Sequence, residues 1–217
     1  MKVIVFGATG MVGQGVLREC LLADDVEEVL AVTRGPLATT HPKLRTHQHD
    51  NFADFTGVDF AGYDACYFCL GVSSVGMSEP DYRRITYDYA MAAVRAMPDD
   101  QVFVYVSGAG TDPDGRQMWQ RVKGRTEDDV IASQVRGYAF RPGFIRPMHG
   151  ARSKVWYYHA LYVALTPLSA VVVRAFPGIA TTTERLGRAM LRVARERPDE
   201  RVWDSKAINE LAVNEAG

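Results

Sequence analysis

The chain begins MKVIVFGATGMVGQG (residues 1–15), and this stretch decides the fold expected for the rest. Its apolar, β-branched run KVIVF is typical of a buried strand in a parallel sheet. Gly7, Gly10 and Gly13 follow, and residues 14–22 have the pattern of a helix. In such a unit one glycine permits a sharp turn, a second lets backbone approach a phosphate, and a third lets the helix pack on the strand. The stretch therefore predicts a cradle for a dinucleotide; the alternative is an ordinary strand-to-helix turn.

Length and charge limit the remaining choices. A chain of 217 residues suits one domain with a full hydrophobic core, so residues 1–217 are expected to form a single dinucleotide-binding domain. A net charge of −1 provides no basic field for nucleic acid, and the expected partner is a small-molecule substrate. The first residues do not have the long apolar region of a signal peptide, which predicts a cytoplasmic location.

The cysteines and histidines do not predict a disulfide framework or a metal site. Cys20, Cys66 and Cys69 are too few for a disulfide scaffold. Cys66 and Cys69 have the spacing of a redox or zinc motif, but in a strand residues three apart point to opposite faces, which favours core packing. His47 and His49 share one strand face without a third ligand nearby, so no metal is expected.

Strand and helix patterns alternate along the chain. This alternation predicts an α/β fold with a doubly wound parallel sheet (Rossmann) and a small, mostly helical C-terminal portion. After the first unit, the expected strands are residues 28–33, 45–49, 63–70, 102–107, 138–140 and 201–203. The expected helices are residues 81–97, 118–134, 183–196 and 205–211.

Residues 144–181 form a distinct apolar segment within this domain. Residues 155–173 contain no acidic or basic side chain apart from His159. We expect two short helices, broken near Pro167, that cover the substrate side of the cofactor. The alternatives are attachment to a membrane surface, a contact between subunits of a homo-oligomer, and a transmembrane helix.

The end of the second strand favours NADP over NAD. In NAD-binding folds an acidic residue about 20 positions beyond the glycines accepts the ribose hydroxyls. Thr33 and Arg34 stand there in this chain. A guanidinium can hold a 2′-phosphate that a carboxylate would repel. The alternative is that Arg34 is a solvated turn residue.

A second group of candidate residues follows the strand at residues 102–107. Ser107 ends that strand, at the sheet edge where ligands bind in such folds. Trp119 and Lys123 are four residues apart on a predicted helix and can project together toward Ser107. The alternative is that all three are structural.

With this serine, aromatic and lysine layout, the chain resembles the short-chain dehydrogenase/reductase superfamily. It is similar to the atypical or extended branch, whose glycine motif TGxxGxxG is represented by TGMVGQG at residues 9–15. Within that branch it resembles the Tat-interacting-protein-like oxidoreductases and bacterial NAD-dependent epimerase/dehydratase-like relatives. The other matching pieces are FCLG at residues 68–71, VKG at 122–124, FRPG at 140–143 and SKAINEL from Ser205.

The resemblance implies a role for individual residues. Arg34 would hold the 2′-phosphate and Asp50 would lie near the adenine. Lys123 would hydrogen-bond the nicotinamide ribose and Ser107 would polarise a substrate carbonyl. The implied pyrophosphate ligands are Gly7, Thr9, Gly10, Met11, Val12 and Gly13. Those implied near the adenosine ribose are Leu70 and Gly71, and those flanking the nicotinamide are Pro142 and Gly143.

Position 119 departs from the family pattern. Active members have tyrosine there, whose phenol supplies a proton, whereas the indole of Trp119 does not ionise usefully. The alternative proton donors are Tyr87, Tyr105, Asp112 and His149. The expected function is an NADP-dependent oxidoreductase acting on a small apolar carbonyl compound. The alternatives are a catalytically weak NADP-dependent sensor or scaffold that binds a protein partner, and a membrane-surface-associated member.

Overall fold

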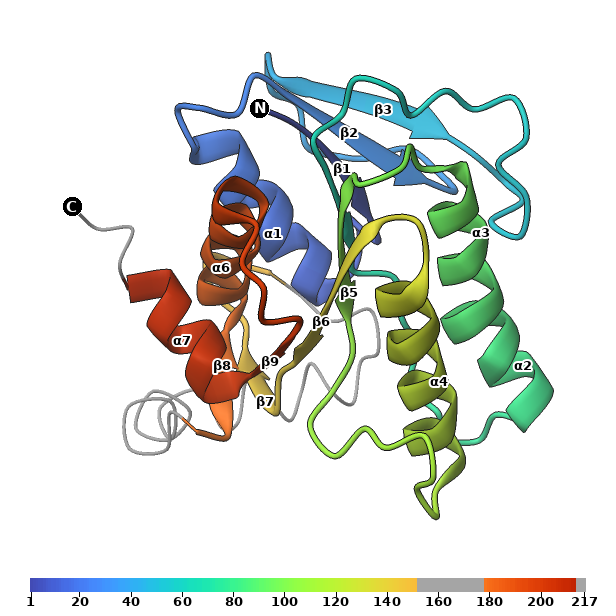
Figure 1. The fold of residues 1–217 in the computed structure, drawn as a ribbon. Helices are drawn as coiled ribbons and strands as arrows, with labels where there is room; N and C mark the ends of the chain where they lie inside the picture. The colour runs from blue at the N-terminus through green and yellow to red at the C-terminus, as the bar shows by residue number, and fades with distance from the viewer. Residues whose placement is uncertain (152–177, 214–217) are drawn as a thin grey trace.

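A seven-stranded parallel sheet forms the centre of the structure, in the order β3-β2-β1-β4-β5-β6-β9 (Figure 1). We describe residues 1–151 and 178–213 of a computed structural model. The strand order runs outward from β1 in both directions, which creates a topological switch point between β1 and β4. The predicted doubly wound sheet is confirmed. Its strands are β1 (Lys2–Phe6), β2 (Glu28–Thr33), β3 (Leu44–Gln48), β4 (Ala65–Phe68), β5 (Val102–Val106), β6 (Arg136–Arg141) and β9 (Val202–Asp204).

Helices cover both faces of this sheet (Figure 1). Along β1, Val3 and Val5 pack into one apolar cluster, and Ile4 and Phe6 pack into the other. Because successive strand residues point to opposite faces, both faces need apolar side chains, which explains the unbroken apolar run of β1. The first cluster lies under α1 (Met11–Leu22), α6 (Thr183–Glu196) and α7 (Ser205–Val213). The second lies under α3 (Tyr89–Ala96) and α4 (Met118–Ala132).

The single helix predicted over residues 81–97 is wrong in one respect, because it is built from three joined pieces. These are α2 (Glu79–Arg83), a π turn η1 (Arg84–Asp88) and α3. The backbone N–H of Tyr89 donates to the carbonyl of Arg84, five residues earlier. A π turn accommodates one extra residue per turn, and the spacing of apolar residues alone does not reveal it.

A second, two-stranded parallel sheet was not predicted. It pairs β7 (Phe144–Arg146) with β8 (Ala180–Thr182), and the Phe144 N–H donates to the Ile179 carbonyl at 2.8 Å. The helices predicted within residues 155–173 lie outside the described residues. No helix among the residues that the structure describes has the length and apolarity needed to cross a membrane.

The first helix packs unusually closely against α6. A Cβ added at Gly15 would lie 2.4 Å from the Thr183 Cβ, and one added at Gly187 would lie 2.8 Å from the Glu19 Cβ. The Glu19 carboxylate at this crossing accepts from Arg188 Nε at 3.1 Å and pairs with Arg18. The two glycines thus permit a helix crossing that larger residues would separate.

We predict that Gly15→Ala lowers the free energy of unfolding by about 1–2 kcal/mol. The added methyl overpacks the crossing, and the helix preference of alanine offsets only part of that cost. Urea denaturation measures the change. Gly35→Ala is the matched control, because a Cβ added there meets no described atom within 4 Å apart from its chain neighbours. Equal stabilities for the two variants would contradict the prediction.

Candidate functional site

A cavity of about 580 Å³ lies at the carboxyl-terminal edge of the main sheet, beyond the ends of β1, β2, β4 and β5. Its described lining residues include no acidic side chain, whereas three basic ones, Arg34, Arg84 and Lys123, line it. A volume of this size suits a small-molecule ligand, and the charge favours an anionic one. From the glycine loop and α1, the lining residues are Gly7, Ala8, Thr9, Gly10, Met11 and Val12.

The glycine loop has the close contacts that its sequence predicts. Gly7 has a φ of +75°, and a Cβ there would lie 2.6 Å from the Cys69 carbonyl oxygen. A Cβ at Gly13 would lie 2.1 Å from the Gly7 carbonyl oxygen, so the helix could not approach the turn. At Gly10, apart from its chain neighbours, the only described atom within 4 Å of an added Cβ is the Gly7 carbonyl oxygen, at 3.3 Å. Gly7 thus makes the turn, Gly13 the close packing, and Gly10 the open approach from the cavity.

The amino end of α1 faces this cavity. The helix begins at Met11, three residues before the predicted start, and its N-cap Gly10 supplies no side-chain cap. Met11 and Val12 line the cavity. Amide N–H groups and the positive end of the helix dipole are therefore directed toward a bound anion, which suits a diphosphate.

Arg34 lies directly after β2, and its side chain lines the same cavity. It is exposed, and it has no ion-pair partner among the described residues. The preceding Thr33 donates its hydroxyl to the Gly35 carbonyl at 2.7 Å, which shapes the turn that holds Arg34. No carboxylate occupies the position that would accept ribose hydroxyls.

The Ser107 hydroxyl is buried at the end of β5, and its hydrogen-bond partner is Thr111. The two oxygens lie 2.9 Å apart, and Thr111 Oγ1 donates to the Gly108 carbonyl at 2.7 Å. A hydroxyl has a single proton, so the Thr111 proton is already used and Ser107 must be the donor between the two. Ser107 therefore presents lone pairs to the cavity, and donation to a substrate carbonyl requires its bond to Thr111 to break.

Lys123 extends from α4 toward the end of β5 and lines the cavity with Ser107. Its Nζ donates to the Val106 carbonyl at 3.3 Å and lies 5.3 Å from the centre of the Tyr105 ring. Burial lowers the pKa of Lys123 to about 8, and the nearby Glu127 carboxylate opposes this shift. The ammonium therefore sits in a site where a polar or anionic ligand would stabilise its charge.

Trp119 does not join Ser107 and Lys123. It is not among the described residues that line the cavity, and its indole N–H donates to the Gln117 side chain. A Cβ at Gly110 would lie 3.5 Å from the Trp119 ring. Residues four apart on a helix share a face, but the direction of a long side chain also depends on such local partners.

Of the other residues implied by the resemblance, some line the cavity and some do not. Leu70 and Gly71 line the cavity after β4. Asp50 is exposed and is absent from the described lining, whereas Phe52, two residues later, is part of it. Pro142 and Gly143 are also absent from that lining: the Pro142 carbonyl accepts from the Ala109 N–H at 2.9 Å, and the Gly143 N–H donates to Ser205 Oγ at 2.9 Å.

None of the four alternative proton donors belongs to the described lining of the cavity. Tyr87 donates to the Asp129 carboxylate at 2.6 Å, which raises the pKa of its phenol. Burial raises the pKa of Tyr105 well above its usual range. His149 pairs with Glu184 at 2.8 Å, and Asp112 is exposed.

Several lining residues were not singled out from the sequence. The most consequential is Arg84, which the π turn carries into the cavity with Ile85 and Tyr89. If residues 81–97 formed one regular helix, Arg84 would be expected on its solvated polar face. The remaining lining residues without a predicted role are Ala8, Val32, Phe52, Cys69, Val72, Ser73, Val106 and Ile145.

The cysteines are all free. Cys20 and Cys66 are buried in the core, and burial raises the pKa of both thiols. Cys69 lines the cavity, and burial raises the pKa of its thiol as well. The His47 and His49 rings stack at 5.7 Å, and no group of three or more metal-ligating side chains occurs among the described residues.

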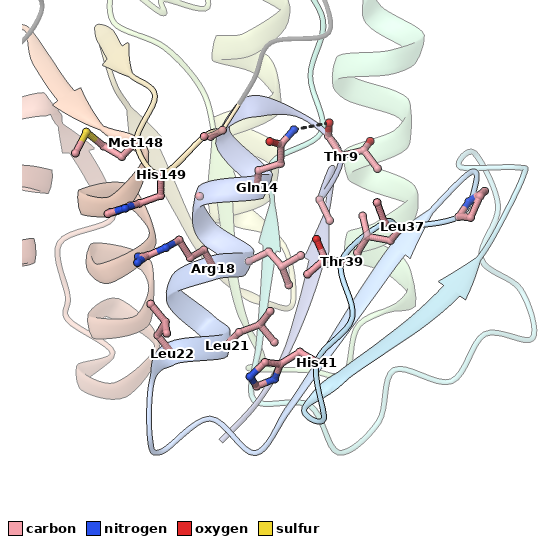
Figure 2. A pocket seen from close by; sticks show the side chains of 17 residues that line it. Thr9, Gln14, Arg18, Leu21, Leu22, Leu37, Thr39, His41, Met148 and His149 are labelled. Atoms are coloured by element: carbon pink, nitrogen blue, oxygen red, sulfur yellow. Dashed lines mark hydrogen bonds between the residues drawn. The ribbon is translucent and has the colours of Figure 1, made fainter. Parts of the chain in front are cut away.

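A second cavity of about 730 Å³ lies on the outer side of the glycine loop, between α1 and the loop after β2 (Figure 2). Ala8 and Thr9 line both cavities, so the loop separates them. Gln14 braces this wall by donating its side-chain amide to the Thr9 carbonyl at 3.0 Å (Figure 2). Ser107 and Lys123 line only the first cavity, which is therefore the candidate site.

Solved structures share this architecture. A UDP-glucuronic acid 4-epimerase from Bacillus cereus, solved with UDP-glucuronic acid and NAD, aligns with a TM-score of 0.69 at 12% identity, covering 94% of this chain and 77% of that one. The Bordetella bronchiseptica enzyme WbmF, solved with NAD⁺, aligns with a TM-score of 0.68 at 14% identity, covering 98% and 76%. The chain has the fold of these two proteins. No protein-family model matches it.

Curated relatives match at low identity. Protein FMP52, mitochondrial, from Saccharomyces cerevisiae is 28% identical over 160 residues, which are 70% of this chain and 68% of that protein. The protein of the same name from Eremothecium gossypii is 26% identical over 150 residues, which are 67% and 66%. The chain thus spans about two thirds of the length of the relatives it matches.

These relatives overturn the expected cytoplasmic location. All four matched relatives are named as mitochondrial proteins. The expectation depended on the first residues not resembling a signal peptide for secretion, and that feature does not separate the cytosol from other compartments.

We predict that Lys123 titrates near pH 8 in the ligand-free protein. NMR of the lysine Cε groups, with Lys123→Arg to assign the signal, measures the pKa, and Glu127→Gln should lower it further because the stabilising negative charge is removed. The unfolded chain keeps a proton on this lysine up to about pH 10.4, so the burial cost to stability is largest below pH 8 and diminishes as pH rises from 8 to 10.4. A Lys123 signal that titrates near pH 10.4 would contradict the prediction.

Proposed function

We propose that the protein binds a nicotinamide dinucleotide at the carboxyl edge of the sheet, with NADP preferred over NAD. The observation that carries the proposal is one cavity that joins the glycine loop, the open amino end of α1 and three basic side chains without a lining carboxylate. A dinucleotide diphosphate needs backbone that no side chain covers, and the glycine loop provides it. The complexes of the structural neighbours with NAD support the same class of ligand.

The proposed contacts follow the elements around the cavity. The lining loop from Gly7 to Val12 would hold the diphosphate, with Gly13 packed behind it, and Arg34 would hold the 2′-phosphate. Leu70 and Gly71 would lie against the adenosine ribose, and Lys123 would donate to the nicotinamide ribose. No direct contact with the dinucleotide is proposed for Asp50, Pro142 and Gly143, because they are absent from the described lining of the cavity.

The proposed reaction is reduction of a small apolar carbonyl compound. When bound, the nicotinamide supplies the hydride. Ser107 would orient the substrate oxygen once its hydroxyl is released from Thr111, and the Lys123 ammonium would stabilise negative charge in the same region. The resemblance to the Tat-interacting-protein-like oxidoreductases, through the pieces at residues 68–71, 122–124 and 140–143, supports this assignment.

A second candidate function is an NADP-dependent sensor or scaffold with little turnover. The position of Trp119 favours it, because the usual tyrosine is absent and the indole donates to Gln117 outside the described cavity lining. Without a positioned acid, the proton must come from water, which costs about 10²–10⁴ in rate. Cofactor occupancy would then matter more than catalysis.

We predict that Arg34→Ala weakens NADP binding about 10–100-fold and leaves NAD binding within about twofold. The guanidinium makes charge-assisted hydrogen bonds only with the 2′-phosphate, which NAD lacks. Isothermal titration calorimetry measures both affinities. Arg45→Ala is the matched control, since this exposed arginine on β3 does not line the cavity. An equal loss for both coenzymes would refute the assignment of Arg34.

We predict that NADPH oxidation with a panel of aldehydes and quinones depends on Lys123 and not on position 119. Lys123→Met should lower kcat/KM at least about 10²-fold. Trp119→Tyr should change it less than about twofold, because that side chain does not line the cavity. A gain above tenfold in Trp119→Tyr would show that the position reaches the reacting groups. An inert wild type whose melting temperature still rises with NADPH would favour the sensor.

A further inference from the structure

We infer that Arg84 is a second phosphate-binding residue of the cavity, which contacts the diphosphate from the helical layer opposite α1. The inference rests on the proposed dinucleotide function. It concerns the phosphates that NADP and NAD share, because Arg34 already provides a cation for the 2′-phosphate.

The π turn directs Arg84 into the cavity. In a regular α-helix, residues five apart are separated by about 140° and face different sides. In η1 the Tyr89 N–H closes on the Arg84 carbonyl, and Arg84, Ile85 and Tyr89 all line the cavity. A distortion of this kind is frequent at functional sites, and here its first residue, Arg84, belongs to the described lining of the cavity.

Contacts with α4 hold the π turn in place. Tyr87 donates to the Asp129 carboxylate at 2.6 Å, and Arg121 of α4 pairs with Glu79 of α2 at 2.9 Å. The segment that carries Arg84 is therefore attached to α4 both before the turn, at Glu79, and within it, at Tyr87. Arg84 is presented from an element whose position is determined before a ligand arrives.

The neighbouring arginine shows that Arg84 is the one available for a ligand. Arg83 lies over the Tyr87 ring at 4.6 Å and pairs with Asp88 at 3.8 Å. Among the described residues, the ion-pair partner of Arg84 is the Asp81 carboxylate, at 4.0 Å, and the Arg84 side chain is 61% exposed. An exposed ion pair at this distance contributes little, so an anion in the cavity can replace it at small cost.

The charge of a diphosphate also calls for a cation on this side. The amino end of α1 provides about half a positive charge, on one face of the sheet. The element η1 joins α2 to α3, which belong to the helical layer on the other face (Figure 1). Residues of η1 and of the α1 amino end line the same cavity at the strand ends. Arg84 and the α1 N-terminus are thus placed to hold one anionic group between them.

The test is calorimetric titration of wild type, Arg84→Ala, Arg84→Lys and Arg83→Ala with NADP, NAD and ADP-ribose. Arg84→Ala should weaken all three by the same factor, about tenfold, because they share the diphosphate. Arg84→Lys should recover part of the loss, and Arg83→Ala should bind within about twofold of wild type. Circular dichroism melting shows whether each variant is folded, and Arg84→Gln replaces Arg84→Ala if the latter is not.

Three results would overturn the inference. Unchanged binding of NAD and ADP-ribose in Arg84→Ala would remove Arg84 from the diphosphate. A loss confined to NADP would assign it to the 2′-phosphate instead. If Arg84→Ala binds all three ligands unchanged but has a raised KM for the carbonyl substrate in NADPH oxidation, Arg84 would instead contact an anionic substrate. If wild type binds none of the three, the proposed function fails as well, and the two failures are thereby told apart.

Discussion

The missing side chain at Gly13 is the constraint on which the rest of the structure depends. A Cβ there would lie 2.1 Å from the carbonyl oxygen of Gly7, so any other residue would push α1 away from the turn. Because α1 starts against that turn, its amide N–H groups face the carboxyl edge of the sheet. The same helix crosses α6 at Gly15 and Gly187, so its position is determined both at its first turn and at this crossing. The cavity exists because this helix lies where it does.

The charges around that cavity come from elements far apart in the chain. Arg34 follows β2, Arg84 lies on η1, and Lys123 lies on α4, and no lining carboxylate among the described residues balances them. Bringing like charges together is unfavourable, and burial, which lowers the pKa of Lys123, separately disfavours the protonated form of this lysine. An anionic ligand relieves this cost. The arrangement of the three cations thus favours an anionic ligand such as the proposed dinucleotide.

The Ser107 hydroxyl and the Trp119 indole each donate a hydrogen bond to a nearby side chain. Thr111 accepts a hydrogen bond from the Ser107 hydroxyl because its own hydroxyl donates to the Gly108 carbonyl, and Gln117 Oε1 accepts from the indole N–H of Trp119. The first contact determines which way Ser107 can act, and the second is made outside the described lining of the cavity. Both contacts are local in the sequence, yet they determine whether Ser107, Trp119 and Lys123 can act on the same ligand.

The sequence by itself determined the parallel sheet, the glycine cradle and the places of Arg34, Ser107 and Lys123. These depend on strand and helix periodicity and on steric limits at single residues, which are local properties. Only the tertiary structure decided that Arg84 and Tyr89 enter the cavity and that Trp119, Asp50, Pro142 and Gly143 stay outside its described lining. A π turn, a side-chain direction and a loop path are each selected by partners distant in the chain, such as α4 for η1. The periodicity of the sequence does not reveal those partners, because these contacts form only when the helical layers pack on the sheet.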